Sequence, residues 1–544
     1  MSTGTITPYR SSQQPGRDDF GHLLLSEWTK FRSVRGWLIA MIGAAVLTTL
    51  AVVALAGIAS GKGNPGADPT NVTGPGGEAV TDNFYFVHQS LDGNGSITAR
   101  VSSLTSSVLP GQVPVGVTPP GSQPWAKAGV IIKASTKPGS AYAAVMATPG
   151  HGVRMQWNYT NDTAGLPGAV SAASPRWLRL TRSGDTITGY DSADGSHWTE
   201  IGTATLGGLP STVQAGLFVA SPQYISGAQS FAGNNWVPLN TQAAAVFDRV
   251  GLSGGQPGAT WKAGYVGGLS VVDGPQGPGG QGCPQPTPGS VCVGKHSEPA
   301  GGLSRSGGAF TVSDYGGDIA PYVAITDPLG TVLKGTVIGL IAVIALGALY
   351  ITAEYRRGLI RTTLVATPRR GRVLAAKAIV IGAVTFVAAL AGAAVGVPIA
   401  ERKLNSGGWV ASVYPVWSLT SAHGVQIVVG TAGLLAVAAI LALSAGSVLR
   451  RSAGAIAAVV VLLIVPLILS VILPQGPADL LLRLTPAAAF AVQQGTPQYS
   501  QVMHTCMPYN GCFPEAPWTG FAVSCAWAAA ALGLAIYLLR RRDA

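Results

Sequence analysis

Six long apolar runs constrain this chain more than any other feature of its sequence. They cover residues 37–59, 332–351, 378–397, 426–448, 453–473 and 521–539. A helix rises about 1.5 Å per residue, so runs of this length cross the roughly 30 Å hydrocarbon core of a bilayer. Hydrocarbon offers the backbone no hydrogen-bond partner, and we therefore predict a six-helix α-helical transmembrane bundle. A signal peptide is the alternative for the first run, but that run is long and lies far from the start, which favours an uncleaved helix.

Basic residues predict the orientation of these helices. Lys and Arg side chains precede the first run, fill the segment 354–377 between the second and third runs, and follow the last run at 540–542. Such residues stay on the cytoplasmic side of a membrane. We therefore expect a multi-pass plasma-membrane protein with both termini in the cytoplasm and with residues 60–329 outside the cell. The net charge of +11 then follows from topology and does not indicate a nucleic-acid partner.

The N-terminal segment is first polar and then amphipathic. Residues 1–17 predict a disordered cytoplasmic tail. In residues 18–35 apolar side chains recur at helical spacing, which predicts an interfacial helix along the inner membrane face. The residues that we assign to this interfacial helix are Glu27, Trp28, Lys30 and Arg32. An ordinary juxtamembrane linker is the alternative.

The stretch 60–329 has the pattern of a β domain, because it contains no run of spanning length. Its short alternating segments predict an all-β antiparallel sandwich over about residues 84–250. Residues 251–305 are rich in Gly and Pro and predict an irregular loop, and residues 310–321 predict one more strand. The alternating segments are 96–101, 129–133, 153–157, 177–182, 186–190 and 215–219.

Four of the five cysteines form two close pairs in predicted external segments. Cys283 and Cys292 lie in the Gly/Pro-rich loop, and Cys506 and Cys512 lie in a second external loop, residues 474–518. Cysteines outside the cell are usually oxidised, so we predict one disulfide in each pair. Zinc binding is the alternative, but no His stands at ligand spacing beside either pair. No metal site is predicted.

The basic segment 354–377 also carries a recognisable order of residues. The positions that define it are Glu354, Arg356, Gly358, Arg361, Thr363, Leu364, Pro368, Arg370, Leu374 and Lys377. This order resembles the segment after the second span in permease subunits of the type 2, exporter-like class of ABC transporters. Residues 26–33 resemble the N-terminal helix of the same family. The alternative is that the cations only set topology.

The resemblance implies a permease subunit of an exporter, driven by a separate cytoplasmic ATPase subunit that holds ATP and Mg. Six spans are few for a complete pore, which suggests a second permease subunit in a homodimer or heterodimer. The chain lacks the phosphate-binding motif G-x-x-x-x-G-K-[ST], so neither enzyme activity nor a cofactor is expected in it. Residues 359–364 are expected to act as a coupling helix, and Glu354 to lie at the membrane edge, where it can pair with a cation. The residues expected to couple to the ATPase are Glu354, Arg356, Arg357, Gly358, Arg361, Thr363, Pro368, Arg370 and Lys377.

Four stretches of the external region resemble the concanavalin A-like jelly-roll domains of bacterial surface proteins and glycan-active enzymes. They are residues 91–93, 126–130, 175–180 and 190–198. The resemblance implies a jelly roll inserted between the first and second spans, but a sandwich hosts many activities. Aromatic rings stack on sugars, although core packing is the alternative role at strand positions. The candidate glycan-binding residues are Trp157, Trp177, Trp198, Tyr142 and Tyr190.

Taken together, the sequence predicts an ABC permease whose external sandwich binds a cell-surface glycan or another partner near the exit. No charged residue stands in the middle of any predicted span, which disfavours ion-coupled transport. The first alternative is a membrane-anchored extracellular recognition protein, lectin-like and without transport activity. The second is an anchored glycan-cleaving enzyme, which needs two carboxylates beside a sugar. Its candidates, most of them in turns, are Asp92, Asp185, Asp191, Asp194 and Glu200.

Overall fold

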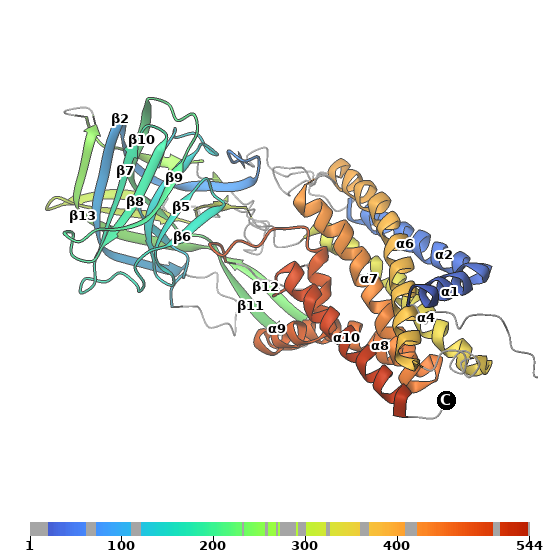
Figure 1. Cartoon of the computed structure of the whole chain (residues 1–544). Coiled ribbons are helices and arrows are strands. Elements are labelled where there is room, and N and C mark those ends of the chain that lie inside the picture. Colours follow the sequence, from blue (N-terminus) through green and yellow to red (C-terminus); the bar gives the residue numbers. More distant parts are fainter. Residues whose placement is uncertain are drawn as a thin grey trace, which may run out of the picture.

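The computed structural model describes residues 20–60, 72–109, 121–230, 233–255, 259–267, 270–271, 290–291, 301–322, 327–359, 369–407, 421–503 and 512–541. These residues form a large antiparallel sheet, nearly closed on itself, and a bundle of helices, which lie at opposite ends of the molecule (Figure 1). The predicted combination of a helical membrane part and an inserted antiparallel β domain is confirmed. Its assignment to the concanavalin A-like jelly rolls stays a prediction.

Six spans in the described part of the chain are long and apolar enough to cross a membrane. The first and third are α2 (Arg35–Ser60) and α6 (Arg370–Ser406), and the second consists of the short α3 (Pro328–Leu333) followed by α4 (Thr336–Arg356). The others are α7 (Ala422–Leu449), α8 (Ser452–Ile472) and α10 (Pro517–Arg541). Outside the spans lie α1 (Phe20–Ser33), α9 (Gln475–Leu484) and the 3-10 helix η1 (Pro486–Gln493). The segment predicted as a loop, residues 474–518, therefore contains two helical elements.

Helix α7 runs through the middle of the bundle, where it contacts α4, α6, α8 and α10. Most of its side chains are buried. Small residues allow the helices to approach closely. At Gly347 in α4, for example, a side chain would collide with the backbone carbonyl of Ala439 in α7. The bundle core is therefore fixed by backbone-to-backbone packing.

One long strand, β2 (Ala79–Val108), is the spine of the sheet. It pairs antiparallel with β7 (Arg176–Ser183), β10 (Thr212–Ala220), β13 (Thr241–Gly255), β14 (Lys262–Val266) and β19 (Asp318–Pro321). From β10 the sheet continues through β3 (Lys127–Lys133), β4 (Tyr142–Thr148), β5 (Gly152–Trp157) and β6 (Asn161–Ala164). From β7 it continues through β8 (Thr186–Ser192) and β9 (Thr199–Thr205), and from β13 through β18 (Ala309–Tyr315) and β17 (Gly302–Ser306). The pair β1 (Val72–Thr73) and β2 is also antiparallel.

Two small sheets stand apart from the large one. The first is the hairpin β11 (Tyr224–Ser230) and β12 (Gly233–Leu239), which reaches toward the helices beside α9 (Figure 1). Strand β12 also contacts α8. The second is a short parallel pair, β15 (Ser270–Val271) and β16 (Ser290–Val291).

The sheet extends further along the chain than the sequence predicted. The irregular loop predicted at 251–305 begins inside β13 and includes β14 and β17. These strands were missed because their alternation is short, whereas in the fold β2 and β18 supply their hydrogen-bond partners. The sheet therefore contains strands from the predicted sandwich, residues 84–250, and also strands from the segment that was predicted to be an irregular loop.

The basic segment 354–377 divides between helices. Helix α4 continues to Arg356, and α6 already begins at Arg370, so Lys377 lies two turns inside a helix. Residues 360–368 lie outside the described residues, and with them Arg361, Thr363, Pro368 and most of the predicted coupling helix. The link between the two helices is thus shorter than the predicted loop.

Candidate functional site

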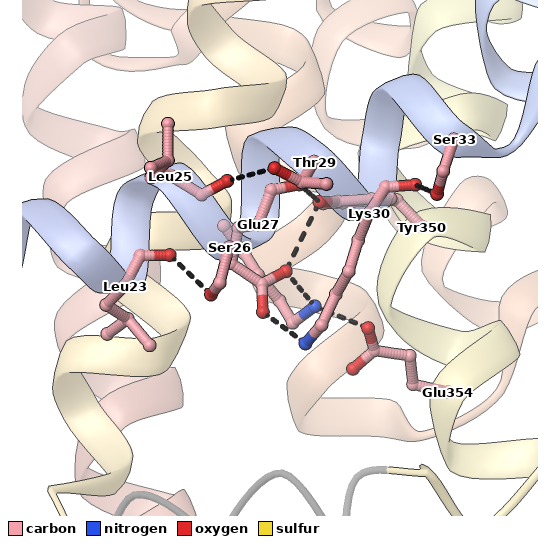
Figure 2. Close-up of polar contacts among 10 residues, drawn as sticks. Leu23, Leu25, Ser26, Glu27, Thr29, Lys30, Ser33, Tyr350 and Glu354 are labelled. Atoms are coloured by element: carbon pink, nitrogen blue, oxygen red, sulfur yellow. Dashed lines mark hydrogen bonds and ion pairs between the residues drawn. The ribbon is translucent and has the colours of Figure 1, made fainter.

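A network of charged side chains joins three helices at the end of the bundle away from the sheet. Glu27 comes from α1, Glu354 from the last turn of α4 and Lys377 from the start of α6. The Nζ atom of Lys377 lies 2.6 Å from Oε2 of Glu27 and 2.5 Å from Oε1 of Glu354. The other oxygen of Glu27 is 2.7 Å from Nζ of Lys30, one turn along α1 (Figure 2). We call Glu27, Lys30, Glu354 and Lys377 the charge network.

Three of the four side chains of the network are buried, which makes their pairing necessary, whereas Lys30 is 45% exposed. The side chains of Glu27 and Lys377 are 0% exposed and that of Glu354 is 15% exposed. A buried charge is costly unless an opposite charge and hydrogen bonds compensate it. Burial alone would raise the pKa of Glu27, but Lys377 and Lys30 outweigh that effect and hold this pKa below its ordinary value. Glu27 is therefore a carboxylate in the folded protein at neutral pH.

Aromatic rings enclose the network on its membrane side. The hydroxyl of Tyr350 in α4 lies 3.4 Å from both Oε2 and the backbone oxygen of Glu27 (Figure 2). The Nζ atom of Lys377 lies 5.0 Å from the centre of the Tyr350 ring, within the range of a cation–π contact. Phe31 and Trp37 pack edge-on against the same ring, with centroids 5.8 and 5.7 Å away. The interfacial helix α1 is thus held against α4 by both charge and packing.

The expected pairing of Glu354 with a cation is confirmed, and Lys377 is that cation. The partnership of Lys377 with Glu27 was not predicted, because 350 residues separate the two side chains in sequence. The sequence does contain one indication of this pairing. Glu27 and Glu354 are acidic residues in strongly basic segments, each beside an apolar run, and an acidic side chain that is buried there needs a cation as its partner.

Exposed arginines at the ends of α4, α6, α8 and α10 form what we call the basic face. Arg356 is the last residue of α4, Arg357 and Leu359 follow it, and all three are exposed. Gly358 between them adopts a left-handed φ of +70°. The exposed Arg residues of the basic face are Arg356, Arg357, Arg369, Arg451, Arg540 and Arg541. Arg370 instead donates through Nη1 to the backbone oxygen of Leu539 in α10, at 3.3 Å. Of the predicted coupling residues, the structure thus presents Arg356, Arg357 and Gly358 to solvent and buries Lys377.

The other predicted members of the interfacial helix point outward. Trp28 is 40% exposed, and Lys30 and Arg32 are exposed. An exposed Trp and two cations on one amphipathic helix suit the boundary between headgroups and acyl chains.

A narrow cavity lies between α2, α4, α6 and α7. Its volume is about 30 Å³, room for roughly two water molecules. The hydroxyls of Thr48, Thr336, Thr385 and Thr431 are among its lining groups. Gln493 from η1 donates to Thr336 Oγ1, at 3.0 Å, and to Thr431 Oγ1, at 3.4 Å. The cavity in the centre of the bundle is therefore small and lined in part by threonine hydroxyls.

The five candidate glycan-binding residues do not form one surface. Tyr142 is fully buried and packs edge-on against Tyr159, with centroids 4.9 Å apart, so its assignment to a sugar site was wrong. It is a core residue because β4 is buried on both of its faces. Trp157 packs against the inner core of the sheet, and Tyr190 is half-buried on β8.

The two remaining tryptophans are covered by arginines. The ring of Trp177 lies against Gly195, where any side chain would clash, and the guanidinium of Arg100 lies 5.8 Å from its centre. The guanidinium of Arg179 lies 3.8 Å from the centre of the Trp198 ring. Arg–Trp stacking of this kind occupies ring faces that a sugar would use.

A buried ion pair also connects β2 and β3 of the sheet. Lys133 lies 2.7 Å from Oδ2 of Asp82, and the Tyr159 hydroxyl donates to the same oxygen at 2.7 Å. The side chains of Lys133 and Asp82 are both 0% exposed. The amide of Gln501, in the segment before α10, donates to the backbone oxygen of Tyr159 at 3.1 Å. This hydrogen bond joins the sheet to the segment before α10.

Asp314 in β18 is a second buried acid of the sheet. Burial raises its pKa to about 7, although backbone N–H groups of Tyr315, Ser221 and Gly317 oppose the rise. This carboxyl group therefore changes protonation near neutral pH.

The predicted disulfides remain predictions, because Cys283, Cys292 and Cys506 lie outside the described residues. Cys525 in α10 is a free, half-buried cysteine. Among the described residues, no three His, Cys, Asp or Glu side chains gather in a way that could hold a metal ion.

Comparison with known proteins gives one informative match. No curated protein matches the chain. Three solved structures show weak likeness. A scytalido-glutamic peptidase with a transition state analog inhibitor is 11% identical over 43% of this chain and 99% of its own, with a TM-score of 0.25. SCP-B, an Eqolisin-family peptidase in complex with the tripeptide Ala-Ile-His, is 8% identical over 43% and 99%, with a TM-score of 0.23. A functionally unknown protein from Saccharomyces cerevisiae is 13% identical over 31% and 74%, with a TM-score of 0.21.

Likeness at these TM-scores carries no argument about fold or function. The informative match is to a family model, described as ABC-2 family transporter protein, over residues 211–544. That stretch includes five of the six candidate spans, the charge network's Glu354 and Lys377, and most of the basic face. Because the match covers more than half of the sequence and agrees with the six candidate spans, this multi-pass membrane protein belongs to the ABC-2 transporter family.

Proposed function

We propose that this chain is the membrane-spanning permease subunit of an ATP-binding-cassette exporter and is driven by a separate ATPase subunit. The family itself comprises the membrane components of transporters, which are not catalytic. ATP and Mg then bind in the partner. The observation that carries the proposal is the charge network, because it connects the helices on both sides of residues 360–368 to α1.

The network provides a mechanical link from that segment to the membrane part. A force on the segment between Arg357 and Arg369 acts on the end of α4 and on the start of α6. Lys377 bonds both Glu354 and Glu27, so α4, α6 and α1 move together rather than separately. Interfaces of this kind convert small displacements into rigid movements of whole helices.

The basic face defines where the ATPase docks. Its exposed Arg residues and the 48% exposed Leu359 combine positive charge with an apolar contact point. Cations beside spans stay in the cytoplasm. This end of the bundle therefore faces the cytoplasm, and the sheet domain lies outside the cell, where it binds a glycan or a surface partner.

A second permease subunit completes the pathway. The central cavity of one chain has room for roughly two water molecules. A substrate larger than water therefore passes between two such subunits or through a conformation opened by the ATPase.

Affinity purification of the tagged full chain from its native host tests the proposal. We expect a cytoplasmic ATPase to co-purify, and the double variant Arg356→Glu with Arg357→Glu to lose it, because repulsion replaces attraction at the basic face. Arg402→Glu is the matched control. It is an exposed Arg at the opposite end of α6 and should retain the ATPase. If no ATPase is recovered under conditions that keep another ABC transporter assembled, the anchored recognition protein becomes the better account.

A further inference from the structure

A buried lysine reaches the place where β19 joins the sheet. Strand β10 pairs with β2 as far as Tyr85, and β19 begins two residues further along β2, opposite Asn83. Lys127 is the first residue of β3. Its Nζ atom lies 2.6 Å from Oδ1 of Asp318 and 2.8 Å from the backbone oxygen of Ile319. The lysine thus contacts both the side chain and the backbone at the start of β19.

Asp314 of β18 lies at the same junction. Its carboxyl group accepts hydrogen bonds from the backbone N–H groups of Ser221, the residue after β10, and of Gly317, the residue before Asp318. Burial and, to a lesser degree, the nearby charge of Asp318 raise the pKa of Asp314 to about 7. At neutral pH a large share of the molecules therefore carries a proton on Asp314. We call Lys127, Asp314 and Asp318 the junction triad.

The junction triad is shielded from water. The side chain of Lys127 is 0% exposed and that of Asp318 is 11% exposed, and Asp314 is buried. An amine and a carboxyl group in water stay apart as ions, because water solvates both and hydrolyses the amide that they form. Exclusion of water removes both obstacles. The site therefore favours condensation of Lys127 with Asp318.

The distance within the pair suits attack of an amine on a carboxyl carbon. A carboxyl carbon lies about 1.2 Å from its oxygens, so Cγ of Asp318 is at most about 4 Å from Nζ of Lys127. Reacting atoms in a near-attack arrangement are about 3–3.5 Å apart. A small movement of the Lys127 side chain therefore brings the two atoms to reacting distance.

We propose that Lys127 and Asp318 condense to an amide cross-link, with Asp314 as the proton donor that assists the step. A proton passes from the Lys127 ammonium to the Asp318 carboxylate, and the free amine attacks Cγ. Asp314 donates its proton to the departing hydroxyl of Asp318 and takes one back from the nitrogen. One N–C bond forms, one C–O bond breaks and one water leaves. Atoms and charge balance without an oxidant or a co-reactant.

The other buried lysine pair of the sheet provides an internal comparison. The Nζ atom of Lys133 lies 2.7 Å from Oδ2 of Asp82, and both side chains are 0% exposed. The group that donates to this carboxylate is the Tyr159 hydroxyl, ordinarily a much weaker acid than a carboxyl group, and burial raises its pKa further. We therefore expect a cross-link at Lys127 and an ion pair at Lys133.

The cross-link fixes the strand that leads to the membrane. It joins β3 to β19 across 191 residues of sequence, and β19 is followed by α3 at the start of the second span. This goes beyond the proposed function, because the bond forms within the sheet domain and requires neither the ATPase nor transport.

Peptide mapping of the purified full chain by mass spectrometry tests the proposal. Trypsin cleaves after Lys and Arg but not after an acylated lysine. We therefore expect a branched peptide in which residues 101–133 are joined to residues 306–334 with the loss of one water. The peptide that contains Asp82, residues 63–100, should be recovered unbranched.

Three variants separate the roles of the junction triad. Lys127→Arg keeps the positive charge but lacks a nucleophilic amine, and it should yield residues 306–334 unbranched. Asp314→Asn keeps the shape of the side chain but removes the acid, and it should lower the cross-linked fraction at least about tenfold. Glu200→Gln removes an exposed acid of β9 and should cross-link like the wild-type chain.

The wild-type measurement decides the bond by itself and does not depend on a variant that folds. Complete cleavage after Lys127 in the wild-type chain would overturn the proposal. A folded Asp314→Asn chain with as much branched peptide as the wild type would overturn the role of the acid. So would a branch at Asp82 as abundant as the branch at Asp318, since burial of a lysine beside an aspartate would then be sufficient.

Discussion

Removing the central cation of the charge network should destabilise the protein strongly. Lys377→Met leaves the carboxylates of Glu27 and Glu354 facing each other without their shared partner. Each had an oxygen within 2.6 Å of one nitrogen, so these oxygens are at most about 5 Å apart. At an effective dielectric of about 20, two such charges repel by roughly 3 kcal/mol. Measured losses from breaking a buried pair are about 3–5 kcal/mol, and we expect that range for Lys377→Met.

The assay is the free energy of unfolding, measured by titrating the full chain in mild detergent with SDS. The control is Lys403→Met, which removes an exposed lysine from the same helix and should change stability by about 0.5 kcal/mol or less. Loss of Lys377 raises the pKa of Glu27, so the deficit of Lys377→Met should shrink as the pH falls from 8 to 5.

A double-mutant cycle isolates the pair. Glu27→Gln with Lys377→Met should be less destabilised than the sum of the two single variants, by at least about 1.5 kcal/mol, because each removes the other's unpaired charge. Additivity within about 0.5 kcal/mol, or a Lys377→Met deficit below about 1 kcal/mol, would refute the reasoning.

Three further predictions concern other parts of the molecule and use thermal or denaturant unfolding of the full chain. The pKa of Asp314 is about 7 in the folded state and ordinarily 3.8. Between pH 3.8 and pH 7 the folded state therefore binds a proton that the unfolded state has lost, and the contribution of Asp314 to stability falls as the pH rises through this range. Asp314→Asn should therefore gain stability relative to wild type at pH 8 compared with pH 5; an unchanged difference would exclude the titration. Gly347→Val should lower the free energy of unfolding by roughly 2 kcal/mol or more, because the new side chain pushes α4 away from α7. Gly533→Val meets open space and should lower it by about 1 kcal/mol or less. Lys133→Met should cost about 3–5 kcal/mol because it strands a buried carboxylate, and the exposed Lys137→Met should be near neutral; similar effects of the two would contradict the role of the buried pair.

The membrane part was the most predictable feature of the fold. Runs of about 20 apolar residues leave a helix as the structure that satisfies the backbone in hydrocarbon. The boundaries of the helices were harder to predict. The basic residues indicated that 354–377 is a single cytoplasmic segment, yet α6 begins at Arg370 and Lys377 is one of its buried residues. The sequence pattern did not show this, because the compensating carboxylate of Glu27 lies on another helix.

The β domain was predictable as a class but not in detail. Alternation along β7 correctly separates the buried Leu178 and Leu180 from the half-exposed Trp177 and Arg179. It fails for β4, which lies between two cores and is buried at every position. A strand covered on both faces carries no alternating signal. For that reason the sequence pattern did not separate the two roles open to Tyr142, sugar binding and core packing.

Photo-cross-linking at Arg357 tests the central claim most directly. A photoreactive amino acid placed there in the full chain, in native membranes, should capture a cytoplasmic protein that contains a nucleotide-binding loop. The same residue placed at Arg402, at the opposite end of the bundle, should not capture it. Capture of an ATPase at 357 and not at 402 is the result that the account predicts. Capture of no ATPase at 357, with the protein correctly inserted, would contradict it.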